Sequence, residues 1–462
     1  MKYLKSFTVL LLLILTTSCG VKRNYRSPDL SSYNLLFRDL STTDTSNTSR
    51  LPWNNLFTDT LLQSLIENTL TNNPDLQIAV ARVKKAEAIF RQSRAEFFPS
   101  LNAGLNASFQ NLNESGQGFP ESYQIFGATS WEADIWGKLR SSKRAALASL
   151  LASESYKRVV QTQLIASVAI NYYTLIALDA QLEITQSTVE KRIKNVEIME
   201  IMKDNDVITG ADLVLSQANR YSAEVLIPDL KQRIYETENT LNLLMGQNPG
   251  SIERNKLEDQ ELSADLKTGV PAQLLANRPD VQEAEYRLRY FFELTNVARR
   301  YFYPSLTISA RGGITETSLQ QLFNTPFVFW NVTGGLIQPI FNYGLNRQRL
   351  KVAQADFEEY QAVFKKTLLT AGEEVVNAML GYQTATEKIT LRAMQIEYLE
   401  KSVEFTMELL KYTSSTNYID VLTSEVNLLQ AQLNSVNDKL EQLQSVVLLY
   451  QSLGGGWKDD EE

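Results

Sequence analysis

Carboxylates are the main residues in this chain whose type and spacing could support acid–base or metal chemistry. The 462-residue chain contains no histidine, which removes the commonest general base and metal ligand. Its single cysteine, Cys19, allows neither an intrachain disulfide nor a thiolate metal cluster. The paired acids Glu373 and Glu374 lie in a long helix-like stretch and are typical of a solvated face. The sequence therefore predicts no enzyme, no metal site and no cofactor.

Two other carboxylates occupy distinctive positions. Asp212 and Asp420 each come just after a tight break between two long helix-like stretches. Thr209-x-x-Asp212 and Asn417-x-x-Asp420 fit a helix N-cap with an acid at the third helical position, where the helix dipole favours negative charge. If several chains came together, copies of each carboxylate would form rings that attract cations. Capping and gating are compatible roles, and both remain open.

The N-terminal segment resembles a processing signal. A positively charged start precedes an apolar run at residues 7–15, which is too short to span a membrane stably. Leu-Thr-Thr-Ser-Cys at 15–19 resembles a bacterial lipoprotein cleavage box, although Thr16 stands where leucine is usual. We expect residues 1–18 to be removed and Cys19 to be acylated, since several acyl chains anchor a protein stably. The alternative is an ordinary signal peptide in which the cysteine is incidental.

A duplicated unit runs through the chain. Asn-Pro-Asp-Leu-Gln at 73–77 recurs as Arg-Pro-Asp-Val-Gln at 278–282, and Phe-Pro-Ser-Leu at 98–101 recurs as Tyr-Pro-Ser-Leu at 303–306. Both pairs are separated by 205 residues. Each unit is predicted to contain a helix that opens with proline, two strands, a long helix, a tight break and a second long helix.

The repeat sets the predicted organisation of the chain. From the N-terminus, we expect a signal peptide at 1–18, a lipidated tether at 19–50, a first repeat at 51–250 with a β-hairpin at 99–136 and long helices at 138–204 and 211–246, an equatorial linker at 251–270, a second repeat at 271–455 with a β-hairpin at 304–341 and long helices at 344–412 and 418–453, and an acidic tail at 456–462. Pro228 should kink or break the helix that contains it.

The strand segments alternate between apolar and polar residues. Residues 101–110 follow a strict period of two, and the same design recurs at 122–135, 306–311 and 328–336. Each strand has about ten residues, the length that crosses a bilayer when tilted. Four aromatic residues could form girdles at the membrane interfaces: Tyr123, Trp131, Phe327 and Trp330. A soluble hairpin with one buried face would show the same alternation.

Four strands are too few to close a barrel, which takes about eight. An open sheet edge is not tolerated in lipid, so strands in a membrane would require oligomerisation. The sequence contains no stretch of about twenty uninterrupted apolar residues, so it predicts no transmembrane helix. A trimer would supply twelve strands, wide enough for a channel.

The long helices are the second architectural signal. Residues 139–203 contain no proline, and a helix of that length would reach roughly 100 Å. Residues 345–412 are the counterpart. Leu422 to Tyr450 form an apolar seam with alternating spacings of four and three, which calls for knobs-into-holes packing. Many flanking residues are small or polar, which favours a layer of coiled coils with one wet face over a solid bundle.

Three motifs connect the chain with a known family. They are Leu-Ala-Asn-Arg-Pro-Asp-Val-Gln-Glu-Ala-Glu at 275–285, Trp-Glu-Ala-Asp-Ile-Trp-Gly-Lys-Leu-Arg at 131–140, and Gln-Pro-Ile-Phe at 338–341 with Gly344. In these motifs, and over residues 50 to 455, the chain resembles the outer membrane factors of the TolC/OprM type, lipoproteins that serve RND-type efflux pumps. The resemblance implies the fold class that we predict, an α+β membrane protein with an internal two-fold sequence repeat. It would be a homotrimer with a trimeric 12-stranded transmembrane β-barrel, four strands per chain, in the bacterial outer membrane. A long α-helical coiled-coil barrel would continue it into the periplasm. The resemblance further implies a passive duct that works with a periplasmic adaptor protein and an inner-membrane RND transporter.

The resemblance also implies roles for residues near the tight breaks at 204–211 and 413–418. Asp420 matches an aspartate that lines the family's constriction, while Asp212 and Tyr412 match residues whose links between helices keep the entrance closed. Better-known members carry a second aspartate where this chain has Thr423, which predicts a weaker cation block. The expected adaptor-docking residues are Val207, Ile208, Gly210, Tyr418 and Ile419.

Other functions remain open at this level. A channel of this type could instead serve type I protein secretion or metal efflux. A protein of another class, a lipoprotein coiled-coil scaffold or adaptor with soluble hairpins, would also explain the seams and the lipid. The net charge of −8 argues against nucleic acid as a partner, because nucleic-acid binding needs a basic face.

Overall fold

The computed structural model describes residues 24–28, 51–109, 121–260, 278–324, 326–412 and 418–457. The predicted signal peptide, Cys19, Asn417 and most of the tether lie outside these residues. The chain divides into two compact units, the first made of 1–28, 82–154 and 283–365, and the second of 29–81, 155–282 and 366–462.

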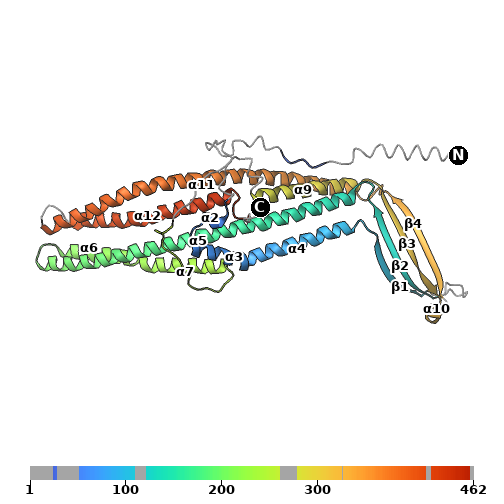
Figure 1. Cartoon of the computed structure of the whole chain (residues 1–462), viewed down its shortest axis with the longest axis horizontal. Helices are drawn as coiled ribbons and strands as arrows, with labels where there is room; N and C mark the ends of the chain where they lie inside the picture. Colours follow the sequence, from blue (N-terminus) through green and yellow to red (C-terminus); the bar gives the residue numbers. More distant parts are fainter. Residues whose placement is uncertain are drawn as a thin grey trace. The chain divides into compact units, whose positions relative to one another are not determined.

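The first unit contains one antiparallel sheet in the order β1-β2-β3-β4 (Figure 1). The strands are β1 (Ser100–Ser108), β2 (Ser122–Ala133), β3 (Ser305–Glu316) and β4 (Phe327–Ile337), with the short helix α10 (Leu319–Asn324) between β3 and β4. Strands β2 and β3 pair directly, with Gly127 opposite Gly312. The hairpins of the two repeats are therefore joined into a single sheet.

The repeat is visible in the helices. The helices α4 (Pro74–Ala95) and α9 (Pro279–Arg300) both have 22 residues and both begin with proline, whose missing N–H costs nothing at a helix start. The long helices α5 (Lys138–Asp204) and α11 (Leu345–Tyr412) have 67 and 68 residues. Among the described residues, α5 is long and apolar enough in one stretch to cross a membrane by length and composition, and 61% of that stretch is buried inside the protein, as in the core helix of a folded domain.

The second long helix differs between the repeats. In the second repeat it is continuous, α12 (Tyr418–Ser452). In the first repeat it is broken into α6 (Gly210–Glu224) and α7 (Leu226–Leu244). Pro228 is the third residue of α7, where its missing N–H has no intrahelical partner to lose. The expected interruption at this proline is confirmed, and it falls at Val225.

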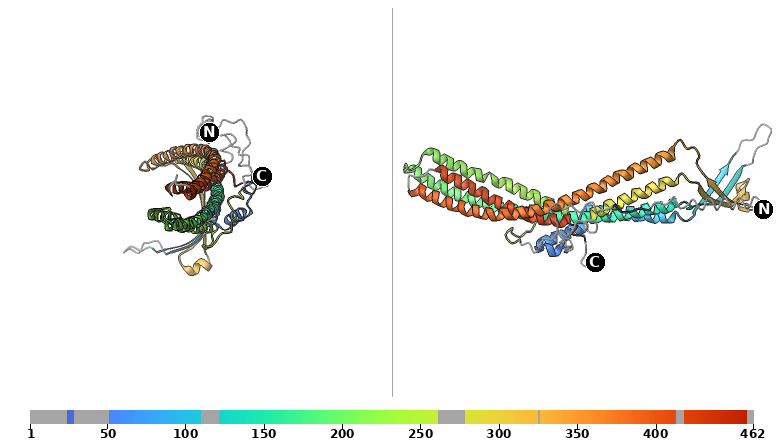
Figure 2. Two further views of the ribbon diagram at one scale, coloured as in Figure 1. Left: turned by 90° about the vertical axis from the view of Figure 1, so that its left-hand side faces the viewer. Right: turned by 90° about the horizontal axis from the view of Figure 1, so that it is seen from above.

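The helices of the second unit lie side by side. Arg392 of α11 donates from Nε to Asp438 of α12 at 2.9 Å, and Gln181 of α5 donates from Nε2 to Asn437 of α12 at 2.8 Å. These bonds place α12 between α11 and α5, and α6 reaches α12 through Asn219, which donates to Glu425 at 3.2 Å. The end-on view of Figure 2 shows these helices along a curved layer that is open on one side. Such a layer has two faces, as the small and polar flanking residues predicted.

The main apolar core of the described residues lies in the second unit. It forms where α3 (Thr60–Asn72) and the short helix α2 (Trp53–Leu56) pack with α5, α12 and α7. Leu62 and Ile66 of α3 are completely buried, as are Tyr172 of α5 and Leu443 of α12.

Asp59 ties the polar segment after α7 to this core. Its carboxylate caps α3 by accepting from the backbone N–H groups of Leu61 and Leu62. It also accepts from Tyr172 Oη at 2.6 Å, and from the side-chain amides of Asn255 and Gln260 at 3.0 and 2.8 Å. Up to residue 260, the segment after α7 therefore packs against the start of α3.

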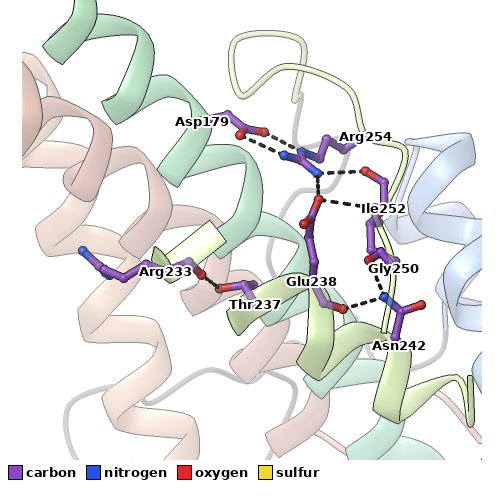
Figure 3. A network of polar contacts seen from close by, with 8 residues as sticks. All are labelled: Asp179, Arg233, Thr237, Glu238, Asn242, Gly250, Ile252 and Arg254. Carbon is purple, nitrogen blue, oxygen red and sulfur yellow. Dashed lines mark hydrogen bonds and ion pairs between the residues drawn. The ribbon is translucent and has the colours of Figure 1, made fainter. Parts of the chain in front are cut away.

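Arg254 provides a second polar anchor for the same segment (Figure 3). It donates from Nε to Asp179 of α5 at 2.6 Å and from Nη1 to the carbonyl of Ile252 at 2.9 Å, and it also binds Glu238 of α7. Asn242 of α7 donates to the carbonyl of Gly250 at 2.7 Å. Polar bonds and two isolated buried residues, Ile252 and Leu257, hold this segment, which explains why its sequence shows no periodicity.

Candidate functional site

The sheet of the first unit has one apolar and one polar face. The registers place side chains that face the same way opposite one another, as with Leu105 and Ile125. The larger residues of the apolar face are Leu101, Leu105, Tyr123, Ile125, Trp131, Leu306, Ile308, Ile314, Val328, Trp330, Val332 and Leu336. The predicted apolar face is thus confirmed in all four strands, although three phenylalanines lie on the opposite face: Phe126, Phe327 and Phe329.

The apolar face is solvent-accessible in the single chain. Leu101 and Leu105 of β1 are 82% and 80% exposed, and Trp330 and Val332 of β4 are 80% and 64% exposed. A contiguous apolar patch of this kind marks contact with another protein or with a membrane. A soluble hairpin that buries its apolar face on its own core is therefore not what the chain forms.

The two edges of the sheet are open in the described part of the chain. There β1 pairs only with β2, and β4 pairs only with β3. Each edge therefore presents a row of backbone N–H and C=O groups without strand partners. Such edges invite pairing with another chain in water and are not tolerated in lipid.

The predicted aromatic girdles need one correction. Tyr123 and Trp131 lie near opposite ends of β2 on the apolar face, where girdles would require them. Trp330 is on the same face but pairs with Gly312 in the middle of the strand. Phe327 pairs with Thr315 on the polar face, so its assignment to a girdle is wrong. Phe327 directly precedes Val328, which is on the apolar face, and successive residues of a strand point to opposite faces.

The break between α5 and α6 lies at one end of the second unit. The N–H of Asp206 donates to Lys203 O at 3.0 Å and that of Val207 donates to Met202 O at 2.9 Å, which is a Schellman ending. Asp206 has φ 59° there, in the left-handed region. The chain reverses within five residues before α6 begins.

Asp212 closes a capping box at the start of α6. Thr209 Oγ1 accepts from the Asp212 N–H at 3.3 Å, and the Asp212 carboxylate accepts from the Thr209 N–H at 3.0 Å. The capping role predicted for Asp212 is confirmed. Its side chain is half-buried beside the break.

The remaining predicted gate residues lie at the same end of the unit. Asp420 is in the first turn of α12, and Tyr412 is the last residue of α11, with 81% of its surface exposed. Figure 1 shows the end of α11 and the starts of α12 and α6 together at this end. One end of the helix layer thus carries all three predicted gate residues.

The predicted docking residues differ in accessibility. Val207 and Ile419 are 59% and 55% exposed. Tyr418 is only 2% exposed and packs with Met199, Leu410 and Val421. The expectation that Tyr418 lies on the tip surface is therefore wrong, because it begins α12 by filling the space between the helices.

A buried polar cluster close to this tip was not predicted from the sequence. We call it the Glu425 cluster, and it consists of Arg192, Asn195, Asn219 and Glu425. The Glu425 carboxylate of α12 accepts from Asn195 of α5 and from Asn219 Nδ2 of α6 at 3.2 Å. Arg192 of α5 donates from Nη1 to the carbonyl of Asn219 at 2.6 Å. The cluster therefore fixes three helices to one another just behind the predicted gate.

Burial sets the ionisation of this cluster. Desolvation raises the pKa of Glu425 above its ordinary value, although Arg192 and the two amide donors favour the charged form. Desolvation likewise lowers the pKa of the Arg192 guanidinium. Arg192 Nε is buried and has no hydrogen-bond partner among the described residues. The packing at the tip is therefore sensitive to the charge on Glu425.

Glu425→Gln should make the heat stability of the protein in detergent less dependent on pH. Because the folded-state pKa of Glu425 is raised, the folded protein retains a proton that the unfolded chain has lost. Wild-type stability should then fall as pH rises from the ordinary carboxyl value through the raised value. Melting curves followed by circular dichroism across this interval measure the effect. Glu400→Gln, an exposed site on α11, is the control; identical pH profiles for Glu425→Gln and the wild type would refute the prediction.

Comparison with known proteins identifies close architectural relatives. The family described as "Outer membrane efflux protein" matches residues 65–247 and 270–455. The solvent efflux pump outer membrane protein SrpC of Pseudomonas putida is 30% identical over 412 residues, which are 87% of this chain and 86% of that protein. The pyoverdine export outer membrane protein OpmQ of Pseudomonas putida is 30% identical over 420 residues, 88% of each chain.

Solved structures share the fold. The outer-membrane channel OprN superposes with a TM-score of 0.85 and 25% identity, covering 95% of this chain and all of that one. The outer membrane protein VceC of Vibrio cholerae superposes with a TM-score of 0.80 and 25% identity, covering 89% of this chain and all of that one.

Proposed function

This chain belongs to the outer membrane efflux protein family, and from that premise we propose that three copies close a twelve-stranded barrel through which solutes leave the cell. The protein is an outer-membrane efflux channel that extends into the periplasm. The three chains would continue below the barrel as a tube of long helices, each chain adding the curved layer formed by α11, α12, α5, α6 and α7.

One observation supports the proposal that the protein forms a trimer. Each chain supplies four strands with a solvent-accessible apolar face and two open edges. Pairing β1 of one copy with β4 of the next satisfies both edges, and three such pairings give twelve strands. The closed sheet would then turn its apolar face to lipid and its polar face to a water-filled lumen.

Conduction through this channel is passive. The sequence contains no G-x-x-x-x-G-K-[ST] nucleotide loop, so the energy for export must come from elsewhere. We infer a tripartite assembly with a periplasmic adaptor and an inner-membrane RND pump. The relatives named for solvent, toluene and antibiotic efflux favour small organic molecules as cargo over proteins or metal ions.

Specific residues would serve this assembly. Acylated Cys19 would anchor each chain to the outer membrane. Asp212, Tyr412 and Asp420 would surround the periplasmic entrance. The docking surface for the adaptor would consist of exposed Val207, Gly210 and Ile419 with half-buried Ile208.

Channel activity is tested by reconstituting the detergent-extracted protein in planar bilayers. We expect discrete conductance steps from a species with the mass of three chains. A protein that inserts only as single chains, without steps, would refute the proposed function. The same preparation serves for tests of the gate.

Asp420→Ala should raise single-channel conductance and weaken block by polyvalent cations, because it removes three carboxylates from the narrow entrance. Thr423→Asp should have the opposite effect, since it adds a second ring one helical turn away. Single-channel recordings with increasing Mg²⁺ measure both effects. Asp204→Ala, at an exposed residue that ends α5, is the control. Unchanged block in Asp420→Ala would remove Asp420 from the gate.

A further inference from the structure

The polar face of the sheet carries a single charged residue away from the strand ends. Within the strands, Glu132 is the last residue but one of β2, and Glu316 is the last residue of β3. Arg311 lies in the middle of β3, opposite Ala128 of β2 and Asn331 of β4. Its position halfway along the sheet calls for an explanation, because an arginine adds nothing to the pairing of the strands.

Neutral groups hold the guanidinium of Arg311. Its Cζ lies 3.7 Å from the ring centre of Phe126 and 5.8 Å from that of Phe329. Its Nη2 donates to Gln124 Oε1 at 3.1 Å. These contacts position the group by cation–π attraction and one hydrogen bond, and none of them neutralises its charge. Arg311 is also exposed, so the remaining N–H groups are accessible.

Gly104 of β1 keeps the Phe126 ring flat against the sheet. A Cβ at Gly104 would lie 2.6 Å from Cζ of Phe126, so the ring occupies the space above the glycine. Covering a strand glycine with an aromatic ring from the next strand fixes the orientation of that ring. The neighbouring strand therefore builds the platform on which Arg311 rests.

We propose that Arg311, Phe126, Phe329 and Gln124 form a binding site for aromatic anions, that is, aryl carboxylates and sulfonates, in the channel lumen. The inference rests on the proposed function, which turns the polar face inward and brings three copies to one level. The guanidinium matches the planar geometry of an anionic oxygen pair. The guanidinium plane, which lies over the Phe126 ring, would stack on its free side with the aromatic body of the solute.

The same site should give the lumen a preference for anions. The side chains on the other face of the sheet at this level are apolar, such as Val332 and Trp330. A positive ring backed by an apolar wall and lipid acts through a lower dielectric than a charge in bulk water. Permeating anions therefore meet a favourable field midway through the barrel.

The test uses wild-type and variant channels in planar bilayers, with naphthalene-2-sulfonate and ethanesulfonate as aromatic and aliphatic probes. Naphthalene-2-sulfonate should block the wild type more strongly than ethanesulfonate. Arg311→Gln should weaken the aromatic block about tenfold and shift the reversal potential in a KCl gradient toward cation preference. Ser309→Ala, on the same face of β3, should change neither.

Variants of the ring separate charge from stacking. Phe126→Leu should weaken the naphthalene-2-sulfonate block about threefold while the reversal potential and the ethanesulfonate block stay unchanged. Gly104→Ala should have the same effect, because the added methyl group displaces the ring. Arg311→Lys should keep the reversal potential but lose part of the aromatic block, since an ammonium group cannot stack or bind two oxygens in parallel.

Two failures can be told apart. If wild-type trimers conduct but Arg311→Gln leaves the aromatic block unchanged, the inference is overturned and the channel function stands. If Arg311→Gln does not assemble, an unchanged aromatic block in both Phe126→Leu and Arg311→Lys overturns the inference in the same way. If the wild type forms no channels, the proposed function fails and takes the inference with it.

Discussion

Arginine in place of Val332 is expected to prevent assembly in the outer membrane, whereas arginine at the next residue, Thr333, should be tolerated. Val332 is 64% exposed on the apolar face, near the middle of β4. An arginine on the lipid face at the bilayer midplane costs roughly 2–4 kcal/mol, and a trimer would contain three. Thr333 pairs with Ser309 on the polar face, where water would solvate the new charge.

The yield of trimer in the outer membrane fraction, measured by native electrophoresis, distinguishes the two substitutions. Val332→Arg should leave little or no trimer, and Thr333→Arg should give close to the wild-type amount. Val332→Leu controls for a change of side-chain volume on the apolar face. Equal yields from the two arginine variants would mean that this face does not contact lipid.

Arg278→Met should destabilise the folded protein by roughly 1–3 kcal/mol, the cost of leaving a buried hydrogen-bonding group without its partner. The Arg278 residue is 6% exposed and precedes α9. It binds Asp280 at 2.6 Å, Glu374 of α11 at 2.7 Å and the carbonyl of Ser452 at the end of α12 at 3.0 Å. The substitution would therefore leave a buried carbonyl and two carboxylates without their common donor.

Denaturant unfolding in detergent, followed by circular dichroism, measures this loss. Arg91→Met is the matched control, because it breaks an exposed Arg91–Glu87 pair one helical turn apart, worth well under 1 kcal/mol. If Arg278→Met unfolded at the same denaturant concentration as Arg91→Met, Arg278 would not be a structural tie.

The contacts of Arg278 also correct one expectation from the sequence. Glu373 and Glu374 were both predicted to be merely solvated, but Glu374 binds Arg278 even though 48% of its side chain is exposed. The two acids are adjacent on one helix and cannot be told apart by type. Only the position of α9 relative to α11 decides which of them meets the arginine.

The architecture was largely predictable because periodic patterns in the sequence indicate its helices and strands. Strict alternation identified the apolar face of each strand, and the repeated Pro-Asp steps identified the equal helices α4 and α9. Pro228 predicted the interruption between α6 and α7. In each case the signal is local: it depends on spacing within a few turns of chain.

The contacts at the tip were not predictable for the opposite reason. Asn195 and Glu425 are 230 residues apart and belong to different repeats. In the sequence each of them is simply a polar residue on a long helix, which also describes a solvated helix face. Tyr418 was assigned to the surface, but an aromatic residue next to a break is equally compatible with an exposed tip and with a buried position between helices. The sequence could not distinguish the two. Whether a helix residue is buried or exposed depends on which helices pack against it, and this packing is part of the tertiary structure.

The number of chains around the pore tests the central claim most directly. Electron microscopy of the detergent-extracted full-length protein should show a threefold particle in which twelve strands, four from each chain, surround a central opening. A particle with a single copy, or one in which the β1 and β4 edges of neighbouring chains do not pair, would contradict the shared barrel.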